Sequence, residues 1–188
     1  MKQTKVRDLM VPLSDYATVS EEATLYEAVM ALEQAQIKFD KDRYRHRAVL
    51  VLDSSGKVVG KLSQLDVLRA LEPKYKELIE DTFGSRFGLS KTLIKSMLDQ
   101  FSLWQRPLMD ICSKAARLRV GEIMHTPSEG EYVDLDASLD EAVHQLIVGH
   151  HQSLLVVHKD KIVGILRLTD VFMHICQLIK ACNLESGN

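Results

Sequence analysis

One short pattern occurs twice in this chain of 188 residues and limits its fold more than any other feature. In each copy an apolar run meets a glycine, and an aspartate follows six positions later: Gly60 and Asp66 in the first copy, Gly164 and Asp170 in the second. After each aspartate, apolar residues recur at the spacing of a helix. This order is typical of a strand that ends in a turn, with a carboxylate in the first turn of the next helix. We therefore expect a chain built from a repeated unit that carries its function.

The repetition extends upstream of these strands. A short amphipathic turn at residues 6–10 returns at residues 120–124, which lie 114 positions further along the chain. Each turn precedes a predicted short strand, at residues 17–19 in the first copy and at residues 132–133 in the second. Each repeated unit therefore starts with the same two local elements.

A predicted helix comes next in both copies. Thr24 with Glu27, and Ser138 with Glu141, have the spacing of a capping box, in which the two side chains bond the free backbone groups at the helix start. The first of these helices carries an apolar stripe that indicates one buried face, formed by Leu25, Ala28, Val29 and Leu32.

The second half of each unit is predicted to be a hairpin followed by a helix. Residues 48–52 and 153–157 are continuous apolar runs typical of buried strands, and residues 53–56 and 158–161 form turns before the next strands. The separation of the two copies falls to 104 positions at the repeated glycine, so the first copy holds about ten extra residues, mostly within residues 37–47.

Each unit is thus predicted to be β-α-β-β-α. A crossover helix implies a parallel strand pair, and a short turn implies an antiparallel one. Because so small a sheet exposes an apolar face, two copies are expected to pack together. We predict an α/β (α+β) fold of two lobes related by a pseudo-two-fold axis, with repeats at residues 1–72 and 118–182 and a helical insertion at residues 73–117.

The insertion is too apolar and too periodic for a flexible linker. Ser90 is placed to cap a helix whose apolar stripe runs from Leu89 to Phe101. The insertion is expected to form two or three helices folded back on the lobes. Alternatively, its apolar stripe is a contact surface for a second subunit or for a regulated protein.

Composition excludes several classes of protein. The net charge of −2 and the pI near 6.4 give no reason to expect binding to nucleic acid. No apolar run approaches the roughly 18–20 residues of a membrane span, and the first residues lack the apolar stretch of a signal peptide. The odd number of cysteines, Cys112, Cys176 and Cys182, favours reduced thiols and a cytoplasmic location.

Neither metal chemistry nor catalysis is indicated. The seven histidines form no HxxxH or HExxH pattern, and the chain contains no GxSxG, P-loop or GxGxxG motif. We expect a protein that is not an enzyme and that requires no metal or cofactor.

The ordered duplicate resembles a tandem pair of CBS domains, named after cystathionine β-synthase and often called a Bateman module. The resemblance covers residues 5–72 and 118–180. In both copies it rests on Val-x-(Asp/Glu)-(Leu/Ile)-Met, (Thr/Ser)-Leu-x-Glu-Ala-Val, an apolar strand, a hairpin and Gly-x5-Asp-Val. It implies a regulatory module whose interlobe cleft binds AMP, ADP, ATP or S-adenosylmethionine. It also implies a flat homodimer, and a response passed to a partner protein.

The resemblance also implies the positions of the ligand contacts. In the family the aspartate of Gly-h-h-(Ser/Thr)-x-x-Asp contacts the ribose, a pattern that the first copy matches with Ser63 and Asp66. The second copy keeps Asp170 but has Arg167 where serine or threonine is usual, with Thr169 two positions further on. Either the second site is impaired, or Arg167 contacts a phosphate directly.

The same chemistry is expected without the family. A carboxylate in the first turn of a helix can accept hydrogen bonds from two ribose hydroxyls, and the free N–H groups there attract phosphate. Ser63 and Asp66 also have the spacing of an acidic capping box, so a purely structural role competes with ligand binding.

A basic segment precedes the second strand of the first lobe. We predict that Arg45, His46 or Arg47 reaches the ligand phosphates, although such runs are often solvated loops. In the second lobe the corresponding approach is occupied by His150, His151 and Gln152. The competing function is a dimerising scaffold without a ligand, which works through the apolar face of the insertion. A nucleotide-handling enzyme is a third alternative.

Overall fold

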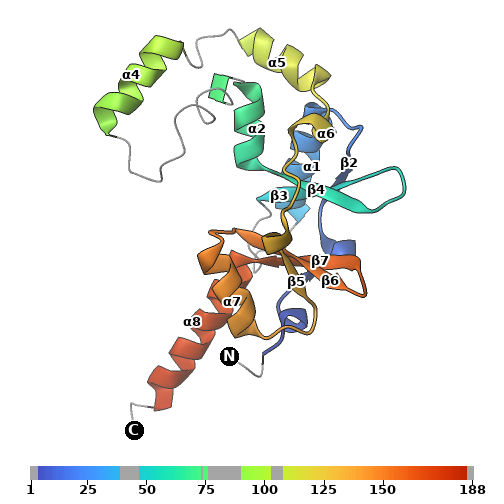
Figure 1. The fold of residues 1–188 in the computed structure, drawn as a ribbon, viewed down its shortest axis with the longest axis vertical. Coiled ribbons are helices and arrows are strands. Elements are labelled where there is room, and N and C mark those ends of the chain that lie inside the picture. Colours follow the sequence, from blue (N-terminus) through green and yellow to red (C-terminus); the bar gives the residue numbers. More distant parts are fainter. Residues whose placement is uncertain (1–3, 39–46, 73, 76–89, 103–107, 186–188) are drawn as a thin grey trace.

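The computed structural model describes residues 4–38, 47–72, 74–75, 90–102 and 108–185. Two small sheets, one built mainly from each repeat, lie at the centre of the molecule with helices around them (Figure 1). The repeats are related by a pseudo-two-fold axis, and each follows the predicted order β-α-β-β-α. The predicted fold class is confirmed.

In each repeat the first two strands are parallel and the last two form an antiparallel hairpin, as predicted. The elements of the first repeat are β2 (Thr18–Ser20), α1 (Leu25–Lys38), β3 (Ala48–Leu52), β4 (Val58–Ser63) and α2 (Gln64–Leu71). Those of the second repeat are β5 (Tyr132–Asp134), α7 (Leu139–Val148), β6 (Ser153–His158), β7 (Lys161–Arg167) and α8 (Leu168–Glu185).

The two sheets pack against each other. Side chains on successive strand residues point to opposite faces of a sheet, so every second side chain of a strand faces the other sheet. Leu50 of β3 and Leu155 of β6 share one buried cluster between the sheets. Val49 and Val51, on either side of Leu50, point the other way, into the core beneath the helices of the first repeat. Strand β3 is therefore buried on both faces, which explains its continuous apolar sequence.

The leading segments of the two repeats are exchanged between the lobes. The 3-10 helix η1 (Val6–Asp8) and strand β1 (Val11–Pro12) lie with the second repeat, where β1 pairs antiparallel with β7. The short helix α6 (Val120–Ile123) contacts β4 and α2 of the first repeat. In Figure 1 the N-terminal segment accordingly lies near α7, and α6 near α1. The sequence predicts each leading segment within its own repeat and does not predict this exchange.

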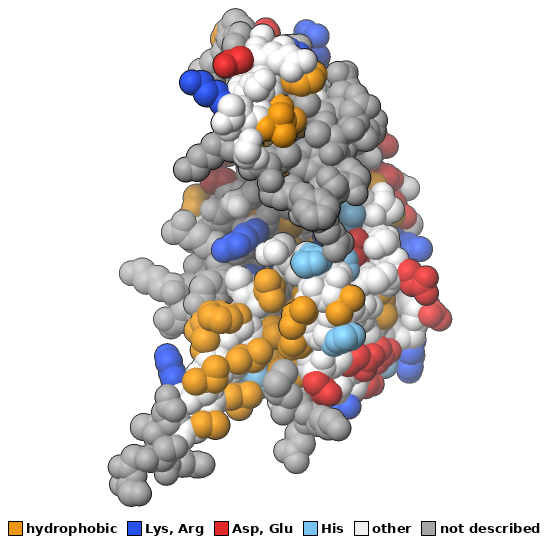
Figure 2. Space-filling model, turned by 60° about the vertical axis from the view of Figure 1, so that its left-hand side comes forward, with side chains coloured by type: hydrophobic (Ala, Val, Ile, Leu, Met, Phe, Trp, Pro, Cys, Tyr) orange, Lys and Arg blue, Asp and Glu red, His pale blue; other side chains and the backbone are white. Residues whose placement is uncertain are grey.

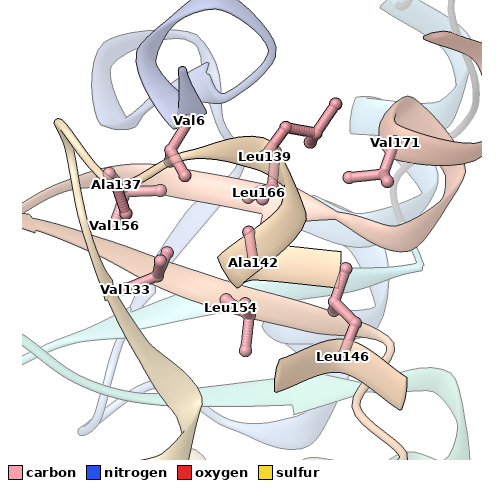
Figure 3. Packing of buried hydrophobic residues seen from close by; sticks show 10 residues of the cluster. All are labelled: Val6, Val133, Ala137, Leu139, Ala142, Leu146, Leu154, Val156, Leu166 and Val171. Atoms are coloured by element: carbon pink, nitrogen blue, oxygen red, sulfur yellow. The ribbon is translucent and has the colours of Figure 1, made fainter. Parts of the chain in front are cut away.

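This exchange is fixed by buried apolar side chains. Val6 enters the core of the second repeat, where it packs with Leu139 and Leu166 (Figure 3). Val120, 114 positions later, is buried in the core of the first repeat. The short amphipathic turns seen in the sequence are thus the parts that attach each repeat to the other.

The repeated glycine is required where the exchanged segment passes. A Cβ atom on Gly60 would lie 2.5 Å from Met124 Sδ and 3.0 Å from the carbonyl oxygen of His125. A Cβ atom on Gly164 would collide with the carbonyl oxygen of Val11. Only a residue without a Cβ lets the two backbones approach this closely.

The predicted capping boxes differ in outcome. At α1 the box is present, since the Thr24 amide donates to Glu27 Oε2 at 2.7 Å and the Glu27 amide donates to Thr24 Oγ1 at 3.2 Å. The box predicted for Ser138 and Glu141 was wrong, because the Ser138 side chain makes no capping hydrogen bond. In both repeats the first helix amide donates to the segment exchanged from the other repeat: Leu139 to the carbonyl of Thr4 at 3.0 Å, and Leu25 to the carbonyl of Leu118 at 2.8 Å.

The described part of the insertion is helical, with a short turn at residues 74–75 before α4 (Lys91–Phe101) and α5 (Leu108–Arg117). Ser90 caps α4 as predicted, since Ser90 Oγ accepts from the Leu93 amide at 3.1 Å. Helix α5 folds back on the first repeat, where Ala115 joins the core and Lys114 Nζ donates to the carbonyl of Leu71 at 2.8 Å.

Within the described residues, no helix has the length and apolar character that crossing a membrane requires.

Candidate functional site

An open cavity of about 440 Å³ lies between the two repeats, near the points where β4 and β7 lead into their helices. Both repeats contribute to its wall. The first repeat and its N-terminal segment supply Tyr16, Arg47, Ala48, Lys61, Ser63, Gln64, Leu65, Asp66 and Arg69. The second repeat and its leading segment supply His125, His150, His151, Gln152, Ser153, Arg167, Leu168 and Thr169.

The two walls are built by the same backbone arrangement. The amide of Gln64 donates to the carbonyl of Arg47 at 3.0 Å, and the amide of Leu168 donates to the carbonyl of Gln152 at 3.0 Å. Arg47 and Gln152 therefore occupy equivalent positions, each just before the middle strand of its repeat. His151, which precedes Gln152, corresponds in chain position to His46.

The predicted phosphate contacts divide between described and undescribed residues. Arg47, His150, His151 and Gln152 all lie in the cavity wall. The predictions for Arg45 and His46 fall outside the described residues. The histidines are held by the end of α7, where His150 has a left-handed φ of 53° and the His151 amide donates to the carbonyl of Leu146 at 3.0 Å.

Asp66 lies in the cavity wall and forms the acidic capping box at the start of α2. Its Oδ2 accepts from the Ser63 amide at 2.9 Å and from Ser63 Oγ at 2.6 Å, and its own amide donates to Ser63 Oγ at 3.2 Å. Its Oδ1 faces Arg69 Nη1 at 3.6 Å. The structural role considered from the sequence is therefore present, and it leaves Asp66 at the cavity.

The second copy replaces this capping box with an ion pair. Arg167 Nε donates to Asp170 Oδ2 and Arg167 Nη2 donates to Asp170 Oδ1, both at 2.5 Å. Arg167 and Thr169 line the cavity, whereas Asp170 is absent from the described lining. The guanidinium of Arg167 is thus engaged by the carboxylate of its own repeat.

The lining residues that were not predicted include Tyr16, Lys61 and His125. Burial raises the pKa of Tyr16 to about 12; the charge of Arg167 opposes this rise and that of Asp170 adds to it. His125 and Lys61 meet because the exchanged segment forms a bridge to β4. Tyr16 and His125 each follow one of the two repeated turns, at residues 6–10 and 120–124. That position in the repeat is the sequence signal that could have identified them.

Beside the cavity, Glu131 of the 3-10 helix η3 (Glu129–Glu131) joins the two repeats. Its Oε2 accepts a hydrogen bond from Lys61, and its Oε1 lies 2.6 Å from His125 Nε2 and 3.1 Å from the Ser128 amide. Burial by itself would raise the pKa of Glu131, but the bonds from Lys61, His125 and Ser128 lower it to about 2. Glu131 is therefore charged at neutral pH.

The cavity favours an anionic ligand. Its described lining carries four lysine and arginine side chains and three histidines. Lys61 and Arg167 are paired with the carboxylates of Glu131 and Asp170, so the preference rests on Arg47, Arg69 and the histidines against the carboxylate of Asp66. Among the described residues, no three histidine, cysteine or carboxylate side chains gather closely enough to hold a metal ion.

Comparison with known proteins identifies the family of this arrangement. The family model of the CBS domain matches twice, over residues 6–73 and residues 120–176, which together make up more than half of the chain. The chain belongs to the CBS-domain family. No curated protein sequence matches this CBS pair closely enough to indicate a relationship.

Solved structures of CBS-domain proteins share the fold. The CBS domain of a CBS-domain-containing membrane protein from Sphaerobacter thermophilus is 18% identical with a TM-score of 0.60, and the match covers 92% of this chain and 88% of that one. CBSX2 in complex with AMP is 21% identical with a TM-score of 0.57, covering 93% and 97%. The CBS domain of a bacterial CNNM/CorC-family Mg²⁺ transporter in complex with ATP is 17% identical with a TM-score of 0.57, covering 93% and 89%.

Proposed function

We propose that this CBS pair is a regulatory module that binds an adenine nucleotide, such as AMP, ADP or ATP, in the cavity between its repeats. S-adenosylmethionine is a further candidate ligand. In this proposal Asp66 and Ser63 hold the ribose, and Arg47 with His151 contacts the phosphates. Filling the cavity changes the packing of the repeats, and the change is passed to a partner protein. We propose no catalytic role.

One observation carries the proposal: the ribose-type motif of the first repeat opens onto the same cavity as Arg47 and His151. The volume of about 440 Å³ lies within the range of cavities that hold small molecules. The apolar side chain of Leu65 and the ring of Tyr16 offer surfaces for a base. The AMP and ATP bound to CBSX2 and to the transporter's CBS domain support this class of ligand.

A thermal-shift panel tests the proposal, with adenosine, AMP, ADP, ATP, S-adenosylmethionine, NADH and cyclic dinucleotides as ligands. A ligand at 100 times its Kd stabilises a folded protein by roughly 2.7 kcal/mol. For a chain of this size each kcal/mol raises the melting temperature by about 2–4 °C, so we expect a rise of about 5–11 °C. If no adenosine-containing ligand raises the melting temperature at millimolar concentration, the proposal fails.

A matched pair of variants assigns any shift to the cavity. Asp66→Asn should abolish the nucleotide-dependent rise in melting temperature, because the change removes the negative charge and replaces one acceptor oxygen with an NH2 group that can only donate. Asp110→Asn alters an exposed aspartate of α5, away from the cavity, and should keep the full rise. Equal shifts in both variants would remove Asp66 from the site.

We further propose a homodimer that forms through the outer helices. Figure 2 shows hydrophobic side chains gathered on one face of the molecule. Equivalent residues of the two repeats, Leu68 of α2 and Phe172 of α8, are 51% and 61% exposed. Exposed apolar residues repeated by pseudo-symmetry suit a self-complementary contact. A cytoplasmic location remains a prediction from the cysteine count.

A second candidate function is the scaffold that binds no ligand. Helix α4 favours it, since Leu93, Ile94 and Leu98 are exposed on this helix. The thermal-shift panel separates the two candidates, because a scaffold without a cavity ligand should show no shift with any nucleotide.

A further inference from the structure

The two repeats present their matching aspartates in different ways. Ser63 and Arg167 are equivalent residues: each ends the last strand of its sheet, opposite Ala48 in the first repeat and Ser153 in the second. The aspartate lies three residues later in both copies. The cavity therefore holds two copies of one arrangement, and the side chain at the Ser63 or Arg167 position is what separates them.

The carboxylate of the first repeat keeps an oxygen available. The small hydroxyl of Ser63 occupies only Oδ2 of Asp66, while Oδ1 faces Arg69 at 3.6 Å, beyond hydrogen-bond distance. The Arg69 side chain is half exposed, and such surface pairs contribute little to stability. A ribose can therefore displace Arg69 at small cost.

The carboxylate of the second repeat has both oxygens occupied. Both oxygens of Asp170 accept from Arg167 at 2.5 Å, the fork geometry that gives arginine its strongest pairs with carboxylates. The Asp170 side chain is as exposed as that of Asp66, at 18% against 16%, so the two carboxylates differ in their partners and not in their burial. The Arg167 side chain is only 7% exposed, and breaking its pair with Asp170 is costly because it leaves a buried charge uncompensated. A ribose would have to pull this pair apart to bind Asp170.

The cavity wall agrees with this difference. Asp66 belongs to the described lining, but in the second repeat Arg167 lines the cavity in the place where Asp170 would otherwise face it. Tyr16, which is buried, lines the same cavity, and its pKa is affected by the charges of both Arg167 and Asp170. The oxygens of the second carboxylate are thus occupied by its own arginine.

We infer that Arg167 closes the second nucleotide site from within, so that each chain binds one nucleotide, at Asp66. This inference rests on the proposed function and adds the number of ligands and the residue that determines it. The guanidinium of Arg167 donates to both oxygens of Asp170, the same oxygens that a ribose would need as acceptors. The pseudo-symmetric fold then carries one working site instead of two.

Isothermal titration calorimetry with ATP and AMP counts the sites directly. We expect one nucleotide per wild-type chain, a loss of binding in Asp66→Asn, and binding unchanged within about twofold in Asp170→Asn. Two nucleotides per wild-type chain, or a loss of binding in Asp170→Asn, would overturn the inference and leave the proposed function standing. If the wild-type chain binds no adenosine-containing ligand of the thermal-shift panel, the proposed function itself is wrong.

Exchanging the two side chains gives the sharper test. Arg167→Ser should raise the stoichiometry to two nucleotides per chain, and a further Asp170→Asn change should return it to one. Ser63→Arg should cover Asp66 in the same way and abolish binding. Arg117→Ser, which alters an exposed arginine of α5, should leave one site.

The folded state of each variant is checked by its circular dichroism spectrum and melting curve. A folded Arg167→Ser chain that binds one nucleotide would overturn the inference. A Ser63→Arg chain that binds as tightly as the wild type would also overturn it, and this arm does not depend on removing a buried arginine.

Discussion

The side chain of Lys61 in β4 of the first repeat donates a hydrogen bond to the carboxylate of Glu131, which belongs to the second repeat. The Glu131 side chain is only 5% exposed, and His125 lies 2.6 Å from its other oxygen. Lys61 and His125 both line the cavity. This ion cluster therefore ties the two repeats together directly beside the proposed ligand.

Replacing Glu131 by glutamine should destabilise the folded chain by about 3 kcal/mol, because the change leaves the Lys61 ammonium without its counter-charge in a shielded position. Urea unfolding followed by circular dichroism measures the effect. Glu129→Gln alters an exposed carboxylate on the same 3-10 helix and should change the free energy of unfolding by less than about 0.5 kcal/mol. Similar losses in the two variants would contradict a role for the cluster.

The same cluster predicts a pH dependence of stability. The pKa of Glu131 is lowered from 4.5 to about 2 in the folded chain, so the folded state holds fewer protons than the unfolded state between these values. Its stabilising contribution is complete above about pH 4.5 and is lost as the pH falls towards 2. The free energy of unfolding should therefore fall less steeply over this range in Glu131→Gln than in the wild type. Parallel pH profiles would count against the lowered pKa.

Gly164→Ala should destabilise the fold by about 1–3 kcal/mol, because the added Cβ meets the backbone carbonyl of Val11, which cannot move without shifting β1. Gly60→Ala should cost less, since its nearest obstacle is the flexible side chain of Met124. Gly130→Ala is the control, with only an ordinary contact to His151 at 3.8 Å. Thermal melts of the three variants give the order, and a Gly164→Ala chain as stable as Gly130→Ala would refute the close passage of the exchanged segment.

Arg47→Ala should weaken ATP binding by roughly tenfold or more while leaving adenosine binding nearly unchanged, because charge-assisted hydrogen bonds to phosphate contribute about 1.5–3 kcal/mol. Calorimetric titration of both ligands measures the split, and Arg117→Ala serves as the control for loss of a positive charge. If ATP and adenosine lose affinity equally, Arg47 does not contact the phosphates.

Phe172→Asp should convert the proposed homodimer to monomers, because it places a charge in an apolar contact surface. Size-exclusion chromatography with light scattering measures the mass. Met109→Asp changes an apolar side chain on α5 that is more exposed than Phe172, at 76% against 61%, and should leave the dimer intact. A dimer that survives the Phe172 change would move the contact to another face.

Much of the local structure could be predicted from the residues themselves. The apolar runs at residues 48–52 and 153–157 form strands, and Ser63 with Asp66 forms the capping box. These features depend on contacts within a few positions, so their spacing in the sequence is enough to reveal them. The box at Ser138 does not form although Thr24 and Glu27, at the same spacing, form one, so this spacing permits a capping box without guaranteeing it.

What the sequence by itself determined was the repeated unit, its β-α-β-β-α order and the residue types at the candidate site. Only the tertiary structure decided that Val6 and Val120 each enter the core of the other repeat. It also decided that Lys61 meets Glu131, 70 positions away in the chain. Asp66 and Asp170 look alike in the sequence, but both repeats together make the cavity wall. This wall includes Asp66 from the first repeat and Arg167, in place of Asp170, from the second. Periodicity records the preferences of each segment, whereas partners far apart in the chain are chosen by packing and charge in the assembled fold.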